Sequence, residues 1–219
     1  MRKALGLYVI PDRVIGAPLS LEEQTRLALE GGASAIQLRD KSMNGRELLE
    51  TARRMATLCE EWGALFIVND RLDVALLSGA EGVHLGQRDL PVAEARKLTP
   101  RSFVIGASIH NAEEAERAEE EGADYLGVGA VFATGSKGDA MVMGLSGLRD
   151  LMTTLKLSHE NRPEGVLPTV AIGGISAETL SDVTRAGVDG VSVISAVVRG
   201  DVKKQAAALK QILIKLLNF

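Results

Sequence analysis

Residues 35–41, AIQLRDK, pass from a short apolar run into a charged segment. The same change occurs at residues 65–71 (LFIVNDR) and 82–89 (GVHLGQRD). Continuous apolar runs of this kind are typical of parallel strands that are buried on both faces. The sequence therefore predicts parallel strands whose carboxyl ends carry polar and charged side chains.

This pattern of short strand and longer amphipathic helix continues along the chain. We predict strands at Leu7–Ile10, Ala35–Leu38, Leu65–Val68, Gly82–Leu85, Phe103–Gly106, Tyr125–Val128, Thr169–Ile172 and Gly190–Ile194. About eight such units in 219 residues predict an α/β fold, a (β/α)₈ TIM barrel formed by one domain over residues 1–219. A doubly wound open sheet is the alternative. Residues 11–13, PDR, lack the glycine-rich turn that a dinucleotide site needs after its first strand.

Composition narrows the class of partner. The formal net charge is −4 and the chain has no long basic tract, which argues against nucleic acid. Cys59 is the only cysteine, so no internal disulfide can form and a reducing cytoplasm is expected. No run approaches the ~20 apolar residues of a membrane span. We expect a cytoplasmic protein that binds small phosphorylated molecules and forms neither nucleic-acid nor membrane complexes, with a homo-oligomer left open.

Two carboxylates follow neighbouring predicted strands. Asp70 comes after the third strand and Asp89 after the fourth. Adjacent parallel strands lie ~5 Å apart, so both carboxylates can reach one ion. Mg²⁺ takes one or two carboxylates and completes its shell with water and substrate phosphate. The sequence predicts a Mg²⁺ site at Asp70 and Asp89. The alternative role for Asp70 is to cap the following helix.

Cationic and amide groups follow the second strand. Residues two apart in an extended segment face the same side, so Gln37, Arg39 and Lys41 point together and Leu38 points away. Two cations suit a diphosphate, and an amide suits the edge of a heterocycle. We predict a metal-linked diphosphate site here.

A second anion site is predicted on the opposite side of the barrel mouth. The glycine-rich loop 129–139 follows the sixth strand and can close over a bound anion. Gly173-Gly174 ends the seventh strand and Ile194-Ser195 the eighth, the region where barrels commonly bind a monophosphate. Two anion sites suggest two phosphorylated substrates joined across the mouth.

Two polar residues have less specific predictions. Ser108 follows the fifth predicted strand and either donates to a phosphate or ring or caps the helix that begins near Asn111. Residues 157–166 read as an insertion on the opposite face of the barrel, so His159 is expected in a surface loop.

Taken together, these motifs resemble the thiamine phosphate synthase family. The likeness covers nearly the whole chain, in order: LYVI (7–10), QLRDK (37–41), NDR (69–71), HLGQRDLP (84–91), TGSK (134–137), AIGGI (171–175) and VIS (193–195). It implies a transferase of thiamine biosynthesis. The enzyme would join hydroxymethylpyrimidine diphosphate to thiazole phosphate and release thiamine monophosphate and pyrophosphate.

The resemblance also implies residue roles. Asp70 and Asp89 would bind Mg²⁺, and Arg39, Lys41 and Lys137 would act on the leaving group. The pyrimidine diphosphate would be bound by Gln37, Leu38, Arg39, Asp40, Lys41, Asn69, Ser108 and Lys137. The thiazole phosphate would be bound by Thr134, Gly135, Ser136, Gly174, Ile194 and Ser195; between Gly173 and Gly174 the motif does not decide.

The family's reaction is dissociative, so the enzyme must stabilise charge on departing pyrophosphate, and no strong base is required. This chain carries Ala130 and Ala133 where relatives often have proline, which predicts a more mobile loop. The alternatives are a thiazole tautomerase on the same fold, a phosphosugar isomerase or lyase, and a barrel that binds thiamine precursors without catalysis.

Overall fold

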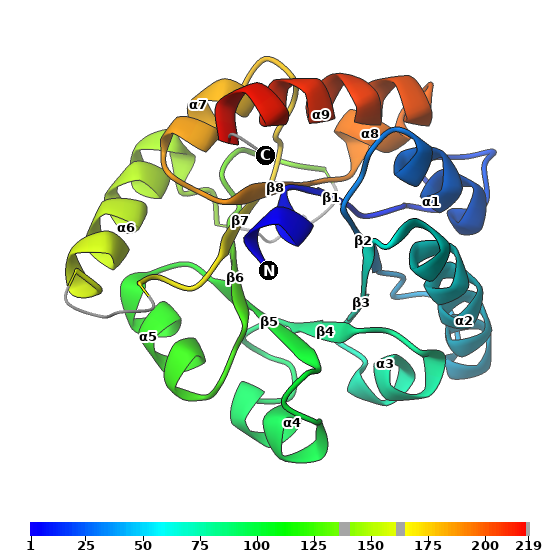
Figure 1. Ribbon diagram of the computed structural model, residues 1–219, viewed down its shortest axis with the longest axis horizontal. Coiled ribbons are helices and arrows are strands. Elements are labelled where there is room, and N and C mark those ends of the chain that lie inside the picture. Colours follow the sequence, from blue (N-terminus) through cyan, green and yellow to red (C-terminus); the bar gives the residue numbers. More distant parts are fainter. Residues whose placement is uncertain (136–140, 161–164, 218–219) are drawn as a thin grey trace.

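The chain forms a closed eight-stranded parallel barrel, which confirms the predicted fold class (Figure 1). The computed structural model describes residues 1–135, 141–160 and 165–217. Each strand is hydrogen-bonded to the next in chain order, and β8 closes on β1 through the pairs Leu7–Val191 and Val9–Val193. The strands are β1 (Leu7–Val9), β2 (Ala35–Leu38), β3 (Leu65–Asn69), β4 (Gly82–Leu85), β5 (Val104–Ile109), β6 (Tyr125–Val128), β7 (Thr169–Ile172) and β8 (Gly190–Val193).

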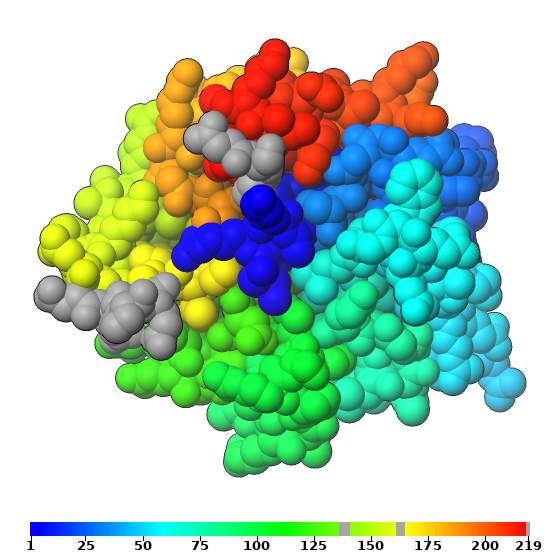
Figure 2. Space-filling view, in the orientation of Figure 1, coloured from blue at the N-terminus to red at the C-terminus, as the bar shows by residue number. Residues whose placement is uncertain are grey.

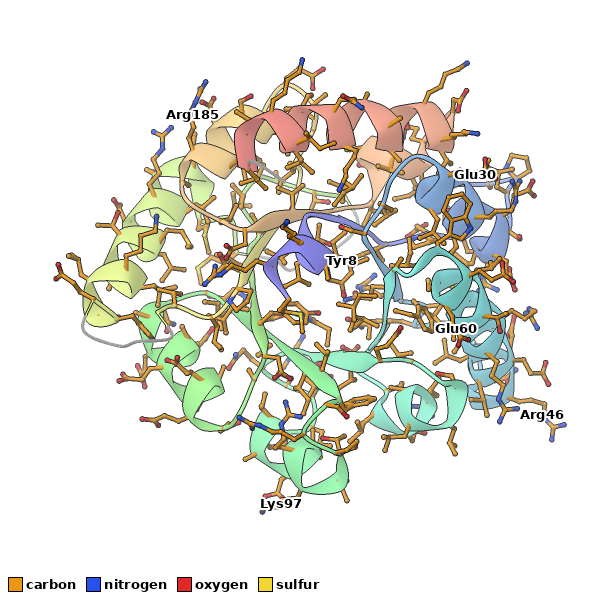
Figure 3. All side chains as sticks on the ribbon, in the orientation of Figure 1. Tyr8, Glu30, Arg46, Glu60, Lys97 and Arg185 are labelled. Atoms are coloured by element: carbon orange, nitrogen blue, oxygen red, sulfur yellow. The ribbon has the colours of Figure 1, made fainter. Side chains whose placement is uncertain are left out.

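Helices surround the barrel in a ring (Figure 1). They are α1 (Leu21–Glu30), α2 (Gly45–Trp62), α3 (Leu72–Ser78), α4 (Val92–Leu98), α5 (Ala112–Glu120), α6 (Gly144–Ser158), α7 (Leu180–Arg185), α8 (Ser195–Val198) and α9 (Val202–Leu217). Charged side chains such as Arg46, Lys97 and Arg185 point outward from this ring (Figure 3). Within the described part of the chain, no helix combines the length and apolar character needed to cross a membrane.

A short 3-10 helix, η1 (Arg2–Leu5), lies over one end of the barrel. The amino-terminal segment occupies the centre of that face (Figure 2). Leu5 is buried and packs with residues of the barrel interior. Since η1 leads directly into β1, it covers the amino-terminal end of the strands and leaves the carboxyl end for a ligand.

The helix starts follow the capping signals in the sequence. Side-chain oxygens of Ser20, Asn44 and Asn111 accept hydrogen bonds from the backbone N–H three residues on, at 3.1, 3.0 and 2.9 Å. Each bond satisfies an amide that the first helical turn leaves without a partner. After α2, Gly63 adopts a left-handed conformation (φ 61°), as a helix-terminating glycine does.

Alternation along the strands divides the core into two parts. Outward side chains such as Leu38, Val83 and Ile105 pack against the helices in the main hydrophobic cluster. Inward side chains such as Tyr8 and Tyr125 form a smaller cluster inside the barrel. Tyr8 lies near the centre of the barrel in Figure 3. A shift of one residue in a strand would exchange these two sets, so the buried faces fix the register.

Two inward-facing glycines make space for aromatic rings. A Cβ at Gly106 in β5 would lie 2.1 Å from Cζ of Tyr125, and a Cβ at Gly127 in β6 would lie 2.8 Å from Cε1 of His84. Neither glycine has a positive φ. Glycine is therefore required at these positions because a neighbouring ring occupies the place of a side chain, and not because of the backbone conformation.

Two sequence predictions are corrected by the fold. Ser108 does not follow the fifth strand: β5 extends to Ile109, so Ser108 faces the barrel interior, and Asn111 caps the next helix. His159 is not in an exposed loop. It is the C-cap of α6, is 6% exposed, and its Nε2 lies 2.6 Å from Glu119 Oε2 of α5. The two ring nitrogens bond both helices, which explains its burial.

The close approach at Gly106 leads to a stability prediction. Gly106→Ala should lower the free energy of unfolding by roughly 3 kcal/mol, because a methyl group there overlaps a fully buried ring. Urea unfolding followed by circular dichroism measures this change. Gly45→Ala is the control, since its Cβ would meet only Arg71 Nη2, at 3.6 Å. Equal stability of the two variants would contradict the conclusion that the ring of Tyr125 leaves no room for a side chain at position 106.

Candidate active site

A cavity of about 660 Å³ opens at the carboxyl ends of the strands. Residues from all eight strands and from the loops that follow them line it. This volume suits a ligand of several rings or phosphates. The cavity is therefore the candidate active site.

One wall of the cavity is cationic. Gln37, Arg39 and Lys41 all line it, while Leu38 is 1% exposed and packs outward against the helices. This is the division that alternation along β2 predicts. Asn69, the last residue of β3, lies on the same wall.

Asp40 has a different environment from its neighbours in sequence. Its Oδ1 accepts hydrogen bonds from the backbone N–H of Ser42 and Met43, at 2.7 and 2.9 Å, and its Oδ2 lies 3.3 Å from Arg13 Nε. These partners hold the pKa of Asp40 below its usual value despite partial burial, which acts in the opposite direction. Asp40 thus organises the loop that carries Arg39 and Lys41.

Asp70 and Asp89 lie next to each other at the ends of β3 and β4. Burial, and then the neighbouring carboxyl group of Asp89, raise the pKa of Asp70 to about 6, against the opposing effect of Lys41 and Arg39. Lys41 Nζ lies 3.8 Å from Asp70 Oδ2. The backbone of Asp70 is left-handed (φ 61°), a conformation that aspartate tolerates better than most residues. Asp70 does not cap α3, whose N-cap is Arg71.

Two adjacent carboxylates fit a divalent cation, because the ion removes the repulsion that contributes to the raised pKa of Asp70. In residues 1–135, 141–160 and 165–217, no group of three or more His, Cys, Asp or Glu side chains could hold a metal ion. A pair leaves most of the coordination shell to water and substrate oxygens. That arrangement is common for Mg²⁺ and rare for structural zinc.

The opposite wall is built from the loops after β6, β7 and β8. Gly173 and Gly174 both have positive φ, 108° and 61°, and both line the cavity. Backbone N–H groups of Val131 and Phe132 donate to the carbonyls of Ile172 and Gly173, at 2.9 and 3.0 Å. A Cβ at Gly174 would lie 2.7 Å from the carbonyl oxygen of Ala133. The two glycines thus permit a close approach of two loops.

The remaining predicted residues on this side are only partly described. Thr134, Ile194 and Ser195 line the cavity, and Gly135 follows Thr134 in the same exposed loop. Ser136 and Lys137 lie outside the described residues. Ser192 of β8 also lines the cavity. Its Oγ is buried and has no hydrogen-bond partner among the described residues, which leaves it available to a ligand.

Sequence analysis missed a hydrogen-bonded group inside the barrel. Tyr8, His84 and Tyr125 line the cavity together with the predicted Gln37 and Ser108. His84 Nδ1 lies 2.9 Å from Tyr125 Oη, and His84 Nε2 lies 2.9 Å from Ser108 Oγ. The available signal was alternation: Tyr8 and His84 are inward residues of strands that were correctly predicted, and both stand in motifs of the resemblance.

Comparison with known proteins identifies the family. A family model described as thiamine monophosphate synthase matches residues 7–197. The chain belongs to this family. It is 48% identical to a thiamine-phosphate synthase of Coprothermobacter proteolyticus over 214 residues, which is 97% of each protein. A thiamine-phosphate synthase of Methanoculleus marisnigri is 50% identical over 206 residues, 93% of each protein.

A solved structure of the same family has the same fold. Thiamine phosphate pyrophosphorylase from Pyrococcus furiosus matches with a TM-score of 0.87 and 44% identity, and the match covers 99% of this chain and 98% of the other. The structure and the relatives therefore agree with the family likeness of the sequence motifs.

The raised pKa of Asp70 predicts how stability depends on pH. Between about pH 4 and pH 6 the folded protein keeps a proton on Asp70 that the unfolded chain releases. The free energy of unfolding therefore falls as pH rises through this window. Asp70→Asn in EDTA should be more stable than the parent protein by about 1–2 kcal/mol at pH 7, and equally stable near pH 3. Urea unfolding at a series of pH values measures the difference.

Added Mg²⁺ should reduce or reverse that difference, because the ion binds the folded carboxylate pair. Asp73→Asn is the matched control: Asp73 follows in the same segment and pairs with Arg71 at the surface. If Asp70→Asn were less stable than the parent protein at pH 7 in EDTA, the proposed repulsion between Asp70 and Asp89 would be contradicted.

Proposed function

We propose that this barrel joins hydroxymethylpyrimidine diphosphate to thiazole phosphate, giving thiamine monophosphate and pyrophosphate. The observation that carries the proposal is that Arg39 and Lys41 line the cavity and that Lys41 Nζ lies 3.8 Å from Oδ2 of Asp70, whose carboxyl group neighbours that of Asp89. A diphosphate leaving group needs cations on its oxygens. A thiazole tautomerase would need neither the metal site nor this cationic wall.

The diphosphate half of the site would lie over β2, β3 and β4. Arg39 and Lys41 would bind the diphosphate oxygens, Arg39 through its planar fork and Lys41 as a point charge. The amide of Asn69 would bind at the same wall, and Gln37 would lie beneath the pyrimidine. By family likeness Lys137 would add a third cation. Leu38 and Asp40 would contribute through the backbone and through loop geometry, since their side chains are engaged elsewhere.

Mg²⁺ would be held by Asp70 and Asp89, and when bound it would neutralise charge on the departing pyrophosphate. The contribution of the protein is to keep the two carboxylates adjacent before the ion arrives. Asp89 is oriented for this by the backbone N–H of Gly86, which donates to Asp89 Oδ2 at 2.7 Å. That bond leaves the other carboxylate oxygen available.

The thiazole phosphate would bind across the cavity. Thr134, Gly135, Ser136, Gly174, Ile194 and Ser195 would form this half of the site. Hydroxyl and backbone N–H groups dominate the described members, and such groups bind a phosphate that remains attached throughout the reaction. The side chains of Ile172 and Ile194 line the same side of the cavity and would contact the thiazole ring.

The reaction would proceed by dissociation followed by capture. The bond between the pyrimidine methylene and the diphosphate oxygen breaks, and its electron pair leaves with pyrophosphate. The thiazole nitrogen then donates its lone pair to the methylene cation and forms the new C–N bond. The cationic wall stabilises the leaving group, and the barrel excludes water that would otherwise capture the cation. We further propose that one barrel domain carries the whole reaction, in the cytoplasm and without nucleic acid.

An end-point assay tests the activity. Purified protein, Mg²⁺ and both substrates should yield thiamine phosphate, detected as fluorescent thiochrome after oxidation. Lys41→Ala and Asp70→Ala should each lower kcat/KM for the pyrimidine diphosphate by about 10²-fold or more, because each removes a charge at the leaving group.

Two surface variants serve as controls for that assay. Lys97→Ala and Asp73→Ala remove charges of the same kind outside the cavity, where Lys97 pairs with Glu94 and Asp73 with Arg71. Both should retain full activity. Absence of product from the folded parent protein would refute the proposed function. Activity that persists in EDTA would refute the proposed dependence on Mg²⁺.

The two halves of the site can be separated by their Michaelis constants. Ser195→Ala should raise KM for thiazole phosphate by about tenfold and leave KM for the pyrimidine diphosphate within twofold, because it removes one phosphate donor. Steady-state kinetics with each substrate varied in turn measures both constants. If only KM for the pyrimidine diphosphate rose, Ser195 would belong to the diphosphate half of the site and the prediction would be wrong.

A further inference from the structure

A continuous chain of hydrogen bonds crosses the barrel interior. Gln37 Nε2 donates to Tyr8 Oη at 2.8 Å, and Tyr8 Oη lies 3.1 Å from Tyr125 Oη. Tyr125 Oη lies 2.9 Å from His84 Nδ1, and His84 Nε2 lies 2.9 Å from Ser108 Oγ. The five side chains come from β2, β1, β6, β4 and β5. The chain therefore links strands on both sides of the cavity.

The direction of each bond follows from the first donor. Tyr8 accepts from Gln37, so its single proton is available for Tyr125. Tyr125 accepts that proton and donates its own to His84 Nδ1. An imidazole that accepts at Nδ1 carries its proton on Nε2, which then donates to Ser108 Oγ. Ser108 is left with a hydroxyl proton to donate.

The hydroxyl proton of Ser108 can point into the cavity. Ser108 lines the cavity, and its hydroxyl has His84 as its only partner in the described residues. Ser108 thus presents a donor to whatever occupies the site. If the hydrogen-bond chain ran the other way, the hydroxyl would present only lone pairs.

The barrel is built around this chain. Gly106 and Gly127 leave space for the rings of Tyr125 and His84, as described above. Tyr8 and Tyr125 are at most 2% exposed. Burial raises the pKa of both phenols, so they stay protonated across the working pH range. The hydrogen-bonded tyrosines therefore keep their protons and do not act as bases.

We propose that Tyr8 and Tyr125 are positioning residues: through His84 they fix the Ser108 hydroxyl as a hydrogen-bond donor to an acceptor atom of the pyrimidine ring. A neutral donor suits an uncharged ring nitrogen, whereas the diphosphate oxygens would face Arg39, Lys41 and a metal ion held by Asp70 and Asp89. The assignment of the acceptor to the pyrimidine rests on the proposed function. The direction of the hydrogen bonds from Gln37 to Ser108 does not depend on it.

Nuclear magnetic resonance tests the direction without activity. In protein labelled with nitrogen-15 at histidine, the neutral form of His84 should carry its proton on Nε2. The signals of His110 and His159 are identified with His110→Gln and His159→Gln variants. A proton on Nδ1 of neutral His84 would overturn the proposal even if the synthase assay succeeds.

Kinetics test the coupling to Ser108. Tyr125→Phe keeps the ring but removes the donor to His84, and should lower kcat/KM for the pyrimidine diphosphate about tenfold, the equivalent of one well-placed hydrogen bond. Tyr8→Phe should have a smaller effect, because Tyr125 can still donate to Nδ1. KM for thiazole phosphate and inhibition by inorganic pyrophosphate should stay within twofold in both.

A double variant distinguishes positioning from general damage. If Tyr125 acts through Ser108, then Tyr125→Phe combined with Ser108→Ala should be no worse than Ser108→Ala alone. Thr184→Val is the control for loss of a buried hydroxyl elsewhere, since the Thr184 hydroxyl donates to backbone carbonyls of its own helix, α7. Additive losses in the double variant, or weakened pyrophosphate inhibition in Tyr125→Phe, would overturn the proposal.

Discussion

The hydrogen-bonded closure of β8 on β1 is the constraint on which the rest of the structure depends. Once the sheet closes, alternate residues of every strand face a single interior, and the others face the helices. Outward positions are filled by Val, Ile and Leu, which pack the helices onto the barrel. Inward positions toward the carboxyl ends include Gln37, Asn69, His84 and Ser108. Register therefore brings residues distant in sequence into one cavity.

Polarity inside the cavity is arranged in two different ways. Charged groups lie at the rim, where Asp70 and Asp89 remain close despite their repulsion and Lys41 partly offsets it. Neutral groups lie deeper, where Tyr8, Tyr125 and His84 satisfy one another. Burying a charge in the interior would cost far more than burying a hydrogen-bonded neutral group. The charged groups are thus confined to the strand ends, and neutral groups that can form hydrogen bonds lie below them.

The elements were predicted well because their signals are local. Strands at residues 35–38, 82–85, 125–128 and 169–172 have the predicted bounds, and the helix expected near Asn111 begins at Ala112 with Asn111 as its cap. Errors came where tertiary packing decided. The fifth strand continues through Ser108 because β6 pairs with it as far as Ile109. His159 is buried by α5, which lies some forty residues earlier in the chain.

By itself the sequence determined the (β/α)₈ fold, the cationic run after β2 and the two carboxylates after β3 and β4, because each depends on periodicity or on a motif at one strand end. Only the tertiary structure decided that Tyr8 reaches Tyr125 and that His84 lies between Tyr125 and Ser108. These contacts join four strands, and they require the empty space at Gly106 and Gly127. No pattern within one strand records a contact across a barrel, because the distance between strands is set by closure and by the volume of the side chains that meet inside.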